Sequence, residues 1–581
     1  MTSPGGVCRS PAPAHPGGRA LGLVHVLANR GRVRTARRLA GLLARSARGL
    51  TAARAAALRE TLDLELSGSD GSNWSTPRAR WAAGLEGLLT ELDRELAVWD
   101  GASPGPVDAV VEALVLAFHP RLHQGAWTSP LVADPRGFAA LLEGHRVMAL
   151  LRGNSAPRLE EADAGPADRG CHPEDATRSD VAVRPHPHPT VCSRVRPPAV
   201  DTPVRLLVLT DTSLTFMTAL LQHWGAHRDV ELRVRDLREE GTDASWWSLR
   251  ATVGDRLAGV SPVPPTHLSE DLRWADVVWV EWGGALAARL SAVDTACVDR
   301  ETTDLASAEP QASRSRPRLI VRLHRYEAFT MYPQVTHWEG VDDLVLVSAA
   351  VGRVLESTVP DIARRTRIQV APNVVDLHRF ALPKRSAAAR TLALIGWDRP
   401  VKDPDWALDV LDVLRAHDPS WRLLLVGRAP TGGDGTAEGT WAQSLNMRVS
   451  AHGSSVVTLG RREDIPEVLR DASVILSSSL VESAHLALQE GTASGCLPVV
   501  RNWPGVAAVG GPLDIYPRDW VVVTPEQGAR RILQAALSAE AGGLGPAGSP
   551  AARTASRWVL DHLDASTTLP LVDEIIGVGQ S

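Results

Sequence analysis

The chain has 581 residues, of which 44% are hydrophobic, so it is long enough for three or more domains with buried cores. Its 62 lysines and arginines nearly balance 67 aspartates and glutamates, which gives no whole-chain charge argument for nucleic-acid binding. The five cysteines are scattered without a Cys-x-x-Cys pair, which argues against a disulfide scaffold. Without a signal-peptide pattern or about 20 consecutive apolar residues, we expect a cytoplasmic protein with no membrane span.

Residues 1–151 are predicted to form a helical accessory region, from Ala-, Leu- and Arg-rich segments at 33–59, 80–99, 106–118 and 136–151. Residues 1–59 contain eleven arginines and no acidic residue. On a helical wheel the arginines take one face, except that Arg54 lies among the apolar side chains. Such a helix over 33–59 could lie on the anionic inner face of a membrane. The alternative is a bundle helix packed against the acidic segment 86–95.

Two α/β domains are predicted after a disordered linker at 152–202, which is rich in Pro, Asp, Arg and His. Short apolar runs then alternate with helix-length segments, the pattern of buried parallel strands. We expect strands at 204–209, 230–234, 276–280, 319–323, 344–347, 368–371, 392–395, 423–426, 456–459, 474–476 and 497–500, with helices at 214–224, 404–416, 464–471 and 484–494. Eleven strands exceed one ordinary sheet, so the domains are placed at 203–384 and 385–545, with a surface insertion at 298–317 and a helical tail at 546–581.

The segment that follows the expected strand 474–476 carries two glutamates in a favourable position. A helix is expected to begin near Ser483, which would place Glu482 at its amino terminus and Glu490 about two turns inside. A carboxylate at such a site can accept two hydrogen bonds from a ribose diol, and the helix terminus can bind a diphosphate. The alternative is that Glu482 only complements the helix dipole and Glu490 is a solvated helix residue.

A cation follows the first strand of the second domain. The chain has only two lysines, Lys384 and Lys402, and Lys402 lies in the loop after strand 392–395. A cation there could neutralise a leaving diphosphate, with Arg399 as a weaker second cation. An exposed loop lysine is the alternative, but a compact ammonium kept where arginine is the default favours a functional role.

These motifs, in this order, resemble glycosyltransferase family 4, over residues 203–545 and most strongly over 391–502. They are the Gly396-to-Lys402 loop, Leu424-Leu-Val-Gly427, Gly460 before Ile465-Pro-Glu-Val-Leu, the paired glutamates, and the hinge segment Ala371-Pro-Asn-Val-Val-Asp-Leu-His-Arg-Phe380. The resemblance implies a GT-B fold, in which two doubly wound Rossmann-like domains face a cleft, here preceded by the helical region. It also implies a retaining transfer of sugar from a nucleotide sugar, for cell-surface polysaccharide or glycoconjugate synthesis.

The resemblance also implies roles for individual residues. Glu490 would bind the ribose hydroxyls, Glu482 the donor sugar or its phosphate, and Lys402 with Arg399 the diphosphate. The loops at Gly427 and Gly460 would hold the base. His324 would lie near the reacting sugar, the alternative being a capping or packing histidine.

The chain departs from the family pattern beside these residues. Trp397 stands where an arginine is usual, and Ser483-Ala484-His485 replaces a Gly-Phe-Gly segment. Ser483 and His485 are therefore expected among the donor-binding residues.

Several choices stay open from the sequence. No cofactor or metal is expected, since the possible ligands Cys171, His172, His186, His188 and Cys192 are irregularly spaced in the linker. The donor base and sugar are open, and the acceptor could be a glycan, a lipid-linked molecule or a small molecule. The alternatives are a GT-B sugar-nucleotide epimerase, which needs further acid and base carboxylates, and a degenerate non-catalytic scaffold, which the altered positions favour.

Overall fold

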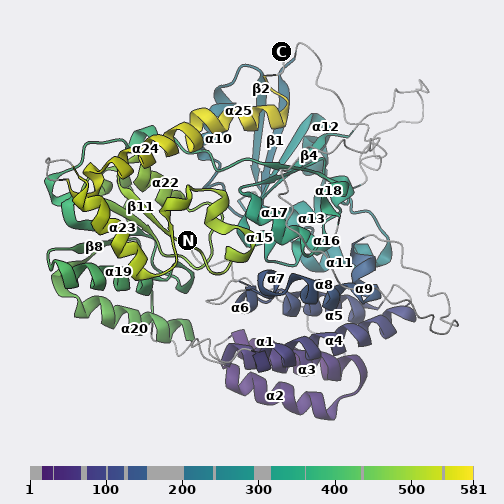
Figure 1. The fold of residues 1–581 in the computed structure, drawn as a ribbon. Helices are drawn as coiled ribbons and strands as arrows, with labels where there is room; N and C mark the ends of the chain where they lie inside the picture. The colour runs from purple at the N-terminus through teal and green to yellow at the C-terminus, as the bar shows by residue number, and fades with distance from the viewer. Residues whose placement is uncertain are drawn as a thin grey trace, which may run out of the picture.

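The computed structural model describes residues 16–29, 32–66, 75–99, 103–123, 129–152, 202–239, 244–293, 316–359, 361–432, 437–539 and 544–579. Figure 1 shows a purple helical region below two α/β domains, with the last helices in yellow running across the top. Nearly all of the predicted linker and of the predicted insertion at 298–317 lies outside the described residues.

The amino-terminal region is helical, as predicted. Its helices are α1 (Pro16–Asn29), α2 (Val33–Ser46), α3 (Gly49–Leu66), α4 (Ser75–Ala97), α5 (Pro104–Ala117), α6 (Pro120–His123), α7 (Pro130–Ala133), α8 (Pro135–Glu143) and α9 (Arg146–Leu151). The single helix expected over 33–59 is wrong, because the chain breaks between α2 and α3 at Gly49, which has a φ of 55°. In the described part of the chain, no helix is long and apolar enough to cross a membrane.

Some arginines of α2 and α3 pair with carboxylates of the bundle. Arg37 binds Asp63 through two contacts, and Arg54, on the inner side of α3, donates to Glu112 of α5 at 2.5 Å. Helix α3 packs against α4, which contains segment 86–95, so the bundle alternative is supported. The acidic groups of that segment have other partners within the described residues, since Asp93 pairs with His145 and Glu91 with Arg94. The region is joined to the next domain by Arg250 of α11 (Leu249–Ala258), which donates to Asp108 at 2.7 Å.

The first α/β domain has a six-stranded sheet in the order β2-β1-β3-β4-β5-β6, parallel throughout. Its strands are β1 (Val204–Thr210), β2 (Val230–Asp236), β3 (Val277–Glu281), β4 (Arg318–Leu323), β5 (Asp343–Leu346) and β6 (Arg367–Val370). Between them lie α10 (Thr218–Ala226), α11 (Leu249–Ala258), α12 (Thr266–Trp274), α13 (Ala285–Leu290), α15 (Arg325–Ala328), α16 (Tyr332–Val335), α17 (Ala349–Glu356) and α18 (Ile362–Arg365). Every residue of β3 and β5 is buried, as in central strands covered on both faces.

The second α/β domain repeats this plan with the order β12-β11-β10-β7-β8-β9, again parallel. Its strands are β7 (Thr391–Ile395), β8 (Arg422–Val426), β9 (Val456–Gly460), β10 (Val474–Ser477), β11 (Leu497–Arg501) and β12 (Val521–Val522). Its helices are α19 (Pro404–His417), α20 (Ala437–Ala451), α21 (Ile465–Leu469), α22 (Leu486–Ala493) and α23 (Pro525–Leu537). The eleven predicted strands are confirmed, and the two-residue β12 is an addition.

The chain ends with two helices that return toward the first domain. Helix α24 (Pro550–Leu563) lies along the second domain, and α25 (Ala565–Ile576) crosses to the first, where Figure 1 shows it beside α10. Val572 and Ile575 of α25 share a buried core with Trp224 of α10. The last element in sequence thus completes the core of the first domain.

Candidate functional site

The candidate site lies where each sheet reverses its strand order. In the second sheet, β7 and β10 are neighbours although the chain winds outward from them in opposite directions. Ligands of doubly wound folds bind at the carboxyl ends of the strands at this switch point. The loop after β7 contains Lys402, and the loop after β10 contains Glu482.

The two loops are bonded to each other. Ser478 Oγ donates to the Lys402 carbonyl at 2.6 Å, and the Leu480 N–H donates to the Val401 carbonyl at 2.8 Å. Arg501, at the end of β11, pairs with Asp403. The ends of three strands therefore fix the backbone on which Lys402 is carried.

Lys402 and Glu482 form an ion pair at the centre of this arrangement. Lys402 Nζ lies 2.5 Å from Glu482 Oε1, which also accepts a hydrogen bond from Ser479 Oγ at 2.8 Å. Burial raises the pKa of Glu482, but Lys402, with His485 and Arg325, more than offsets this and holds it at about 2. Glu482 is therefore ionised at neutral pH.

The predicted helix start at Ser483 is wrong. Helix α22 begins at Leu486, and the residue before it, His485, has a left-handed backbone with φ of 48°. Glu482 and the half-buried Ser483 therefore lie in the loop, and Glu482 is held by Lys402 rather than by a helix dipole. Gly495, with φ of 86°, follows the helix at its carboxyl end.

His485 presents a buried nitrogen with no partner. Trp503 Nε1 donates to Ser477 Oγ at 3.0 Å, and that oxygen lies 2.6 Å from His485 Nδ1. We assign the hydroxyl proton to this contact, which leaves the imidazole proton on Nε2. Burial lowers the pKa of His485 to about 4, so the ring is neutral. Nε2 has no hydrogen-bond partner in the part of the chain that the structure describes, and can donate to a ligand.

Glu490 is set apart from the ion pair and has a different environment. It lies half-buried on α22, where burial raises its pKa to about 7 and the charge of Arg379 counteracts only part of that effect. The interpretation of Glu490 as a simply solvated residue does not fit this burial. Its carboxyl group is close to half-ionised at neutral pH.

The glycines of the neighbouring loops adopt conformations that favour glycine. Gly396, Gly427 and Gly460 end β7, β8 and β9 with φ of 81°, 124° and 64°. Gly396 N–H donates to Val426 O, and Gly427 N–H donates to Gly460 O, both at 2.8 Å. A Cβ on Gly427 would lie 3.5 Å from Gly396 Cα, so the two loops pass closely beside each other.

In the first domain the switch point lies between β1 and β3 and carries an aromatic cluster. The rings of Trp282 and His324 have centroids 4.4 Å apart, and Phe216 lies 5.4 Å from His324 and 5.8 Å from Trp282. Trp282 has a φ of 75°, a rare conformation for a bulky residue, and its Nε1 donates to Ser213 O at 2.6 Å. Phe216 and Trp282 are half-buried, so part of each ring remains accessible.

His324 is held beneath this cluster by a buried carboxylate. His324 Nε2 lies 2.9 Å from Glu281 Oε1, and Trp279 Nε1 donates to Glu281 Oε2 at 2.9 Å. Burial raises the pKa of Glu281, but Arg322 and His324 reverse this and hold it below its ordinary value. With 5% of its surface exposed and Nε2 engaged, His324 is well placed to orient Trp282.

Arg325 connects the two halves of the site electrostatically. It begins α15 in the first domain, is half-buried, and its Nη1 has no hydrogen-bond partner within the described residues. Burial lowers the pKa of Arg325, and the carboxylate of Glu482 in the second domain acts against this. The charge of Arg399 also acts on Arg325, and Lys402 and Arg325 are the two cations whose charges act on Glu482.

Sequence reasoning missed Glu281, Trp282, Phe216 and Arg325. The signal for Glu281 was present, because a carboxylate closes the apolar run of β3 at the edge where ligands bind. Arg325 directly follows His324 and could have been paired with it. The positive φ of Trp282 has no sequence signal, since glycine is the residue expected in that conformation.

Comparison with known proteins finds a family similarity in part of the chain. Residues 389–538 match the family described as "Glycosyl transferases group 1". No curated protein matches the chain by sequence.

Three solved structures illustrate the similarity in three dimensions. Anabaena HepE, in complex with UDP-glucose, has 12% identity and a TM-score of 0.44, over 64% of this chain and 99% of HepE. A glycosyltransferase from Rickettsia africae has 14% identity and a TM-score of 0.43, over 65% of this chain and 98% of its own. Sucrose-phosphate synthase from Thermosynechococcus elongatus has 13% identity and a TM-score of 0.40, over 64% and 98%.

The matched range begins at the edge of β7 and ends after α23, so it spans the second sheet and includes Lys402, Glu482 and Glu490. The first sheet supplies the second doubly wound domain of the same architecture. The carboxyl-terminal α/β domain is thus similar in sequence to group 1 glycosyltransferases, and together with the preceding doubly wound domain it has the two-domain arrangement of a GT-B fold.

Proposed function

We propose that the protein transfers a sugar from a nucleotide sugar to an acceptor bound by the first domain. The Lys402–Glu482 pair at the switch point of the group 1 domain carries this proposal. The pair combines a cation for the leaving diphosphate with an ionised carboxylate for the sugar hydroxyls. The donor would be held on the second domain, with its reacting sugar turned toward Arg325 and the aromatic cluster.

The donor-side roles follow from the environment of each group. Lys402, supported by Arg399 and by Arg325 from the opposite domain, would stabilise the charge that develops on the diphosphate. His485 Nε2 would donate to a phosphate or sugar oxygen, which would satisfy a buried donor. Glu490 would accept from the ribose diol, and the loops at Gly427 and Gly460 would contact the base. Ser483 would contact the donor from the same loop.

Trp397 explains how the site departs from the family pattern. It is 1% exposed and part of the hydrophobic core of the second domain, so it supplies no charge to the donor. Arg325, with its unpartnered Nη1, would compensate for the missing arginine from the opposite domain. These cationic side chains support metal-independent transfer, because they would neutralise the charge on the diphosphate that a metal ion would otherwise neutralise.

On the acceptor side, Phe216 and Trp282 would form one wall. His324 enters the proposal as a positioning residue, because its Nε2 is engaged by Glu281 and its ring packs under Trp282. For retaining transfer, the leaving phosphate would assist deprotonation of the acceptor, so no separate base is required.

The first test is binding and turnover of nucleotide sugars. UDP-, GDP-, ADP- and dTDP-sugars are screened by thermal shift, because a bound ligand raises apparent stability. The selected donor is then assayed for hydrolysis and transfer with wild type, Lys402→Ala and Glu490→Ala, with and without EDTA. Arg390→Gln is the matched control, since it removes a cation at the opposite end of β7, where Arg390 pairs with Asp418.

We expect one donor class to stabilise the wild type and Arg390→Gln equally. Lys402→Ala should lower turnover by about 10²–10³-fold, the effect of removing a group that stabilises developing charge. Normal binding without turnover in the wild type would instead favour the scaffold alternative, and interconversion of the donor sugar would favour the epimerase. The proposal fails if no sugar nucleotide binds, or if both site variants turn over normally.

A further inference from the structure

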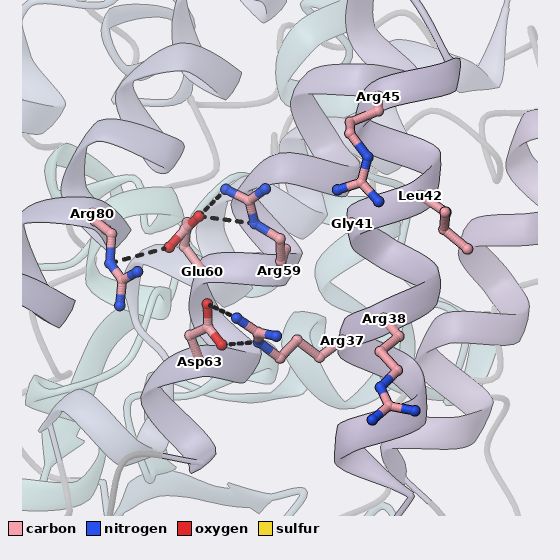
Figure 2. A pocket seen from close by; sticks show the side chains of 9 residues that line it. All are labelled: Arg37, Arg38, Gly41, Leu42, Arg45, Arg59, Glu60, Asp63 and Arg80. Carbon is pink, nitrogen blue, oxygen red and sulfur yellow. Dashed lines mark hydrogen bonds and ion pairs between the residues drawn. The ribbon is translucent and has the colours of Figure 1, made fainter.

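A hollow of about 570 Å³ lies in the amino-terminal helices, far along the chain from the glycosyltransferase domain. It is lined by Arg37, Arg38, Gly41, Leu42, Arg45, Arg59, Glu60, Asp63 and Arg80, from α2, α3 and α4 (Figure 2). Five arginines face two carboxylates, so the hollow carries excess positive charge. Its size is that of a small molecule or a head group rather than of a flat protein interface.

Three of the arginines are already engaged with the two carboxylates. Arg37 binds Asp63 with a fork of two contacts, and Arg59 binds Glu60 Oε1 through Nε at 2.9 Å and through Nη2. Arg80 Nε lies 3.8 Å from Glu60 Oε2. Figure 2 shows these pairs side by side, with Arg37 extending from α2 to Asp63 of α3 and Arg80 of α4 directed toward Glu60.

Arg38 and Arg45 are the uncommitted cations. They lie on α2 two turns apart, both are exposed, and neither has a hydrogen bond or ion pair within the described residues. Between them Gly41 has no side chain, and a Cβ placed there would lie 3.6 Å from Arg45 Nη1 and 3.4 Å from Arg59 Cδ. The glycine therefore keeps the floor of the hollow open beside the Arg45 guanidinium and the Arg59 side chain.

Glu60 provides an independent indication of a ligand. The residue is 6% exposed, and its buried Oε2 has no hydrogen-bond partner among the residues that the structure describes, since Arg80 is too distant for one. A buried carboxylate oxygen that lacks a donor is costly, so a ligand hydroxyl placed there would be favourable. The hollow thus offers cations for an anion and an acceptor for a neighbouring hydroxyl.

We propose that this hollow binds a polyol phosphate, with the phosphate on Arg38 and Arg45 and a hydroxyl donating to Glu60 Oε2. Each guanidinium can form paired hydrogen bonds with an oxyanion, and a phosphate offers two such groups more acceptor oxygens and more negative charge than a single carboxylate does. Two sources share this chemistry: a soluble sugar or glycerol phosphate, and the head group of a glycerol phospholipid. Leu42, 56% exposed at the rim, is compatible with the second source.

The test compares two probes on the full chain. Glycerol 3-phosphate is titrated by calorimetry, and phosphatidylglycerol vesicles are tested by co-sedimentation against phosphatidylcholine vesicles. The pocket variant is Arg38→Gln with Arg45→Gln. The matched control is Arg34→Gln with Arg48→Gln, which removes the same charge from exposed positions of the same region outside the hollow. Gly41→Leu keeps every charge and fills the floor.

We expect the wild type and the control pair to bind at least one probe with similar affinity. The pocket pair and Gly41→Leu should bind it about tenfold more weakly or worse, given the usual strength of charge-assisted hydrogen bonds. Binding of glycerol 3-phosphate alone would identify a soluble ligand, binding of vesicles alone a lipid, and binding of both a shared head group. The proposal is overturned if neither probe binds, if the control pair weakens binding equally, or if Gly41→Leu has no effect while well folded by circular dichroism.

Discussion

Both lysines of the chain have specific structural partners. Lys402 binds Glu482, and Lys384 donates to Leu469 O at 2.8 Å and Ser494 Oγ at 2.9 Å, with Cys496 Sγ at 3.0 Å. An ammonium group directs three donors at separate atoms around one point, which the planar fork of arginine cannot do. In a chain that uses arginine almost everywhere else, each of the two lysines therefore marks a position where an ammonium group has specific partners.

Glu490 makes stability depend on pH in a direction opposite to that of most carboxylates. Its folded pKa of about 7 exceeds the ordinary value of 4.5, so the fold favours the protonated form. That contribution is fully present below pH 4.5 and is lost as the pH rises through 7. Glu490→Gln stays neutral, so at pH 8 we expect it to be more stable than the wild type by about 1–2 kcal/mol, allowing for partial exposure.

Chemical denaturation of the two proteins between pH 4.5 and 8 measures this difference. The variant should match the wild type at the acid end and exceed it at pH 8, while losing most stabilisation by the nucleotide sugar. Parallel pH profiles for the two proteins would show that Glu490 is not a buried acid.

At position 282 a glycine variant should be more stable than an alanine variant, which is the reverse of the usual order of stability. Its φ of 75° is comfortable for glycine and strained for every residue with a Cβ. Both substitutions remove the indole and its bond to Ser213, so they differ mainly in backbone strain. We expect Trp282→Gly to be more stable than Trp282→Ala by about 1 kcal/mol, whereas alanine is normally the more stable residue.

Thermal and denaturant unfolding of the two variants tests this without a substrate. The same pair should show equal defects in acceptor use and normal donor-induced stabilisation, since both lack the ring. A more stable alanine variant would mean that Trp282 adopts an ordinary backbone conformation.

At the scale of elements, the strands were predictable and the loops between them were not. Buried parallel strands can be recognised in the sequence as apolar runs, whereas β12, with two residues, is too short to form such a pattern. The break between α2 and α3 had a signal in Gly49, but the start of α22 did not, because His485 enters it with a left-handed backbone. The contact between Lys402 and Glu482 joins residues 80 positions apart and depends on strand order, which local sequence does not specify.

Helix α22 lies so close to β10 that only glycine fits at position 491. A Cβ on Gly491 would lie 2.5 Å from Cγ1 and 2.6 Å from Cβ of Ile475. Gly491→Ala must therefore push the helix away from the sheet, at a cost of about 1–3 kcal/mol. Because Glu490 is the preceding residue, donor binding should weaken as well.

Unfolding free energy and donor thermal shift measure the two effects. Gly87→Ala is the control, because Gly87 lies within α4 with nothing within 4 Å of a new Cβ. There alanine should raise stability, by up to about 1 kcal/mol. A neutral Gly491→Ala would show that α22 is not in close contact with β10.

At the scale of the whole molecule, the two α/β domains are tied together at several points. Arg353 of α17 pairs with Asp514 and donates to Val509 O of the second domain at 2.7 Å. Leu377 N–H donates to Asp564 at 2.8 Å, at the junction of α24 and α25. On α25, Asp573 accepts from Trp224 Nε1 at 3.1 Å and lies 2.8 Å from His223 Nε2. The predicted tail therefore connects the domain proposed to bind the donor with the one proposed to bind the acceptor.

This arrangement predicts that a substitution in α25, near the carboxyl terminus, destabilises the first domain. Ile575 is 4% exposed in the core shared with β1 and α10, whereas Leu571 of the same helix is 43% exposed. Ile575→Ala should cost about 2–5 kcal/mol and Leu571→Ala less than about 1 kcal/mol. Amide hydrogen exchange locates the effect, and β1 should lose protection in Ile575→Ala while β10 keeps more of it. Equal loss of protection in both sheets would mean that the domains unfold as one unit, and no loss in β1 would mean that α25 does not stabilise the first domain.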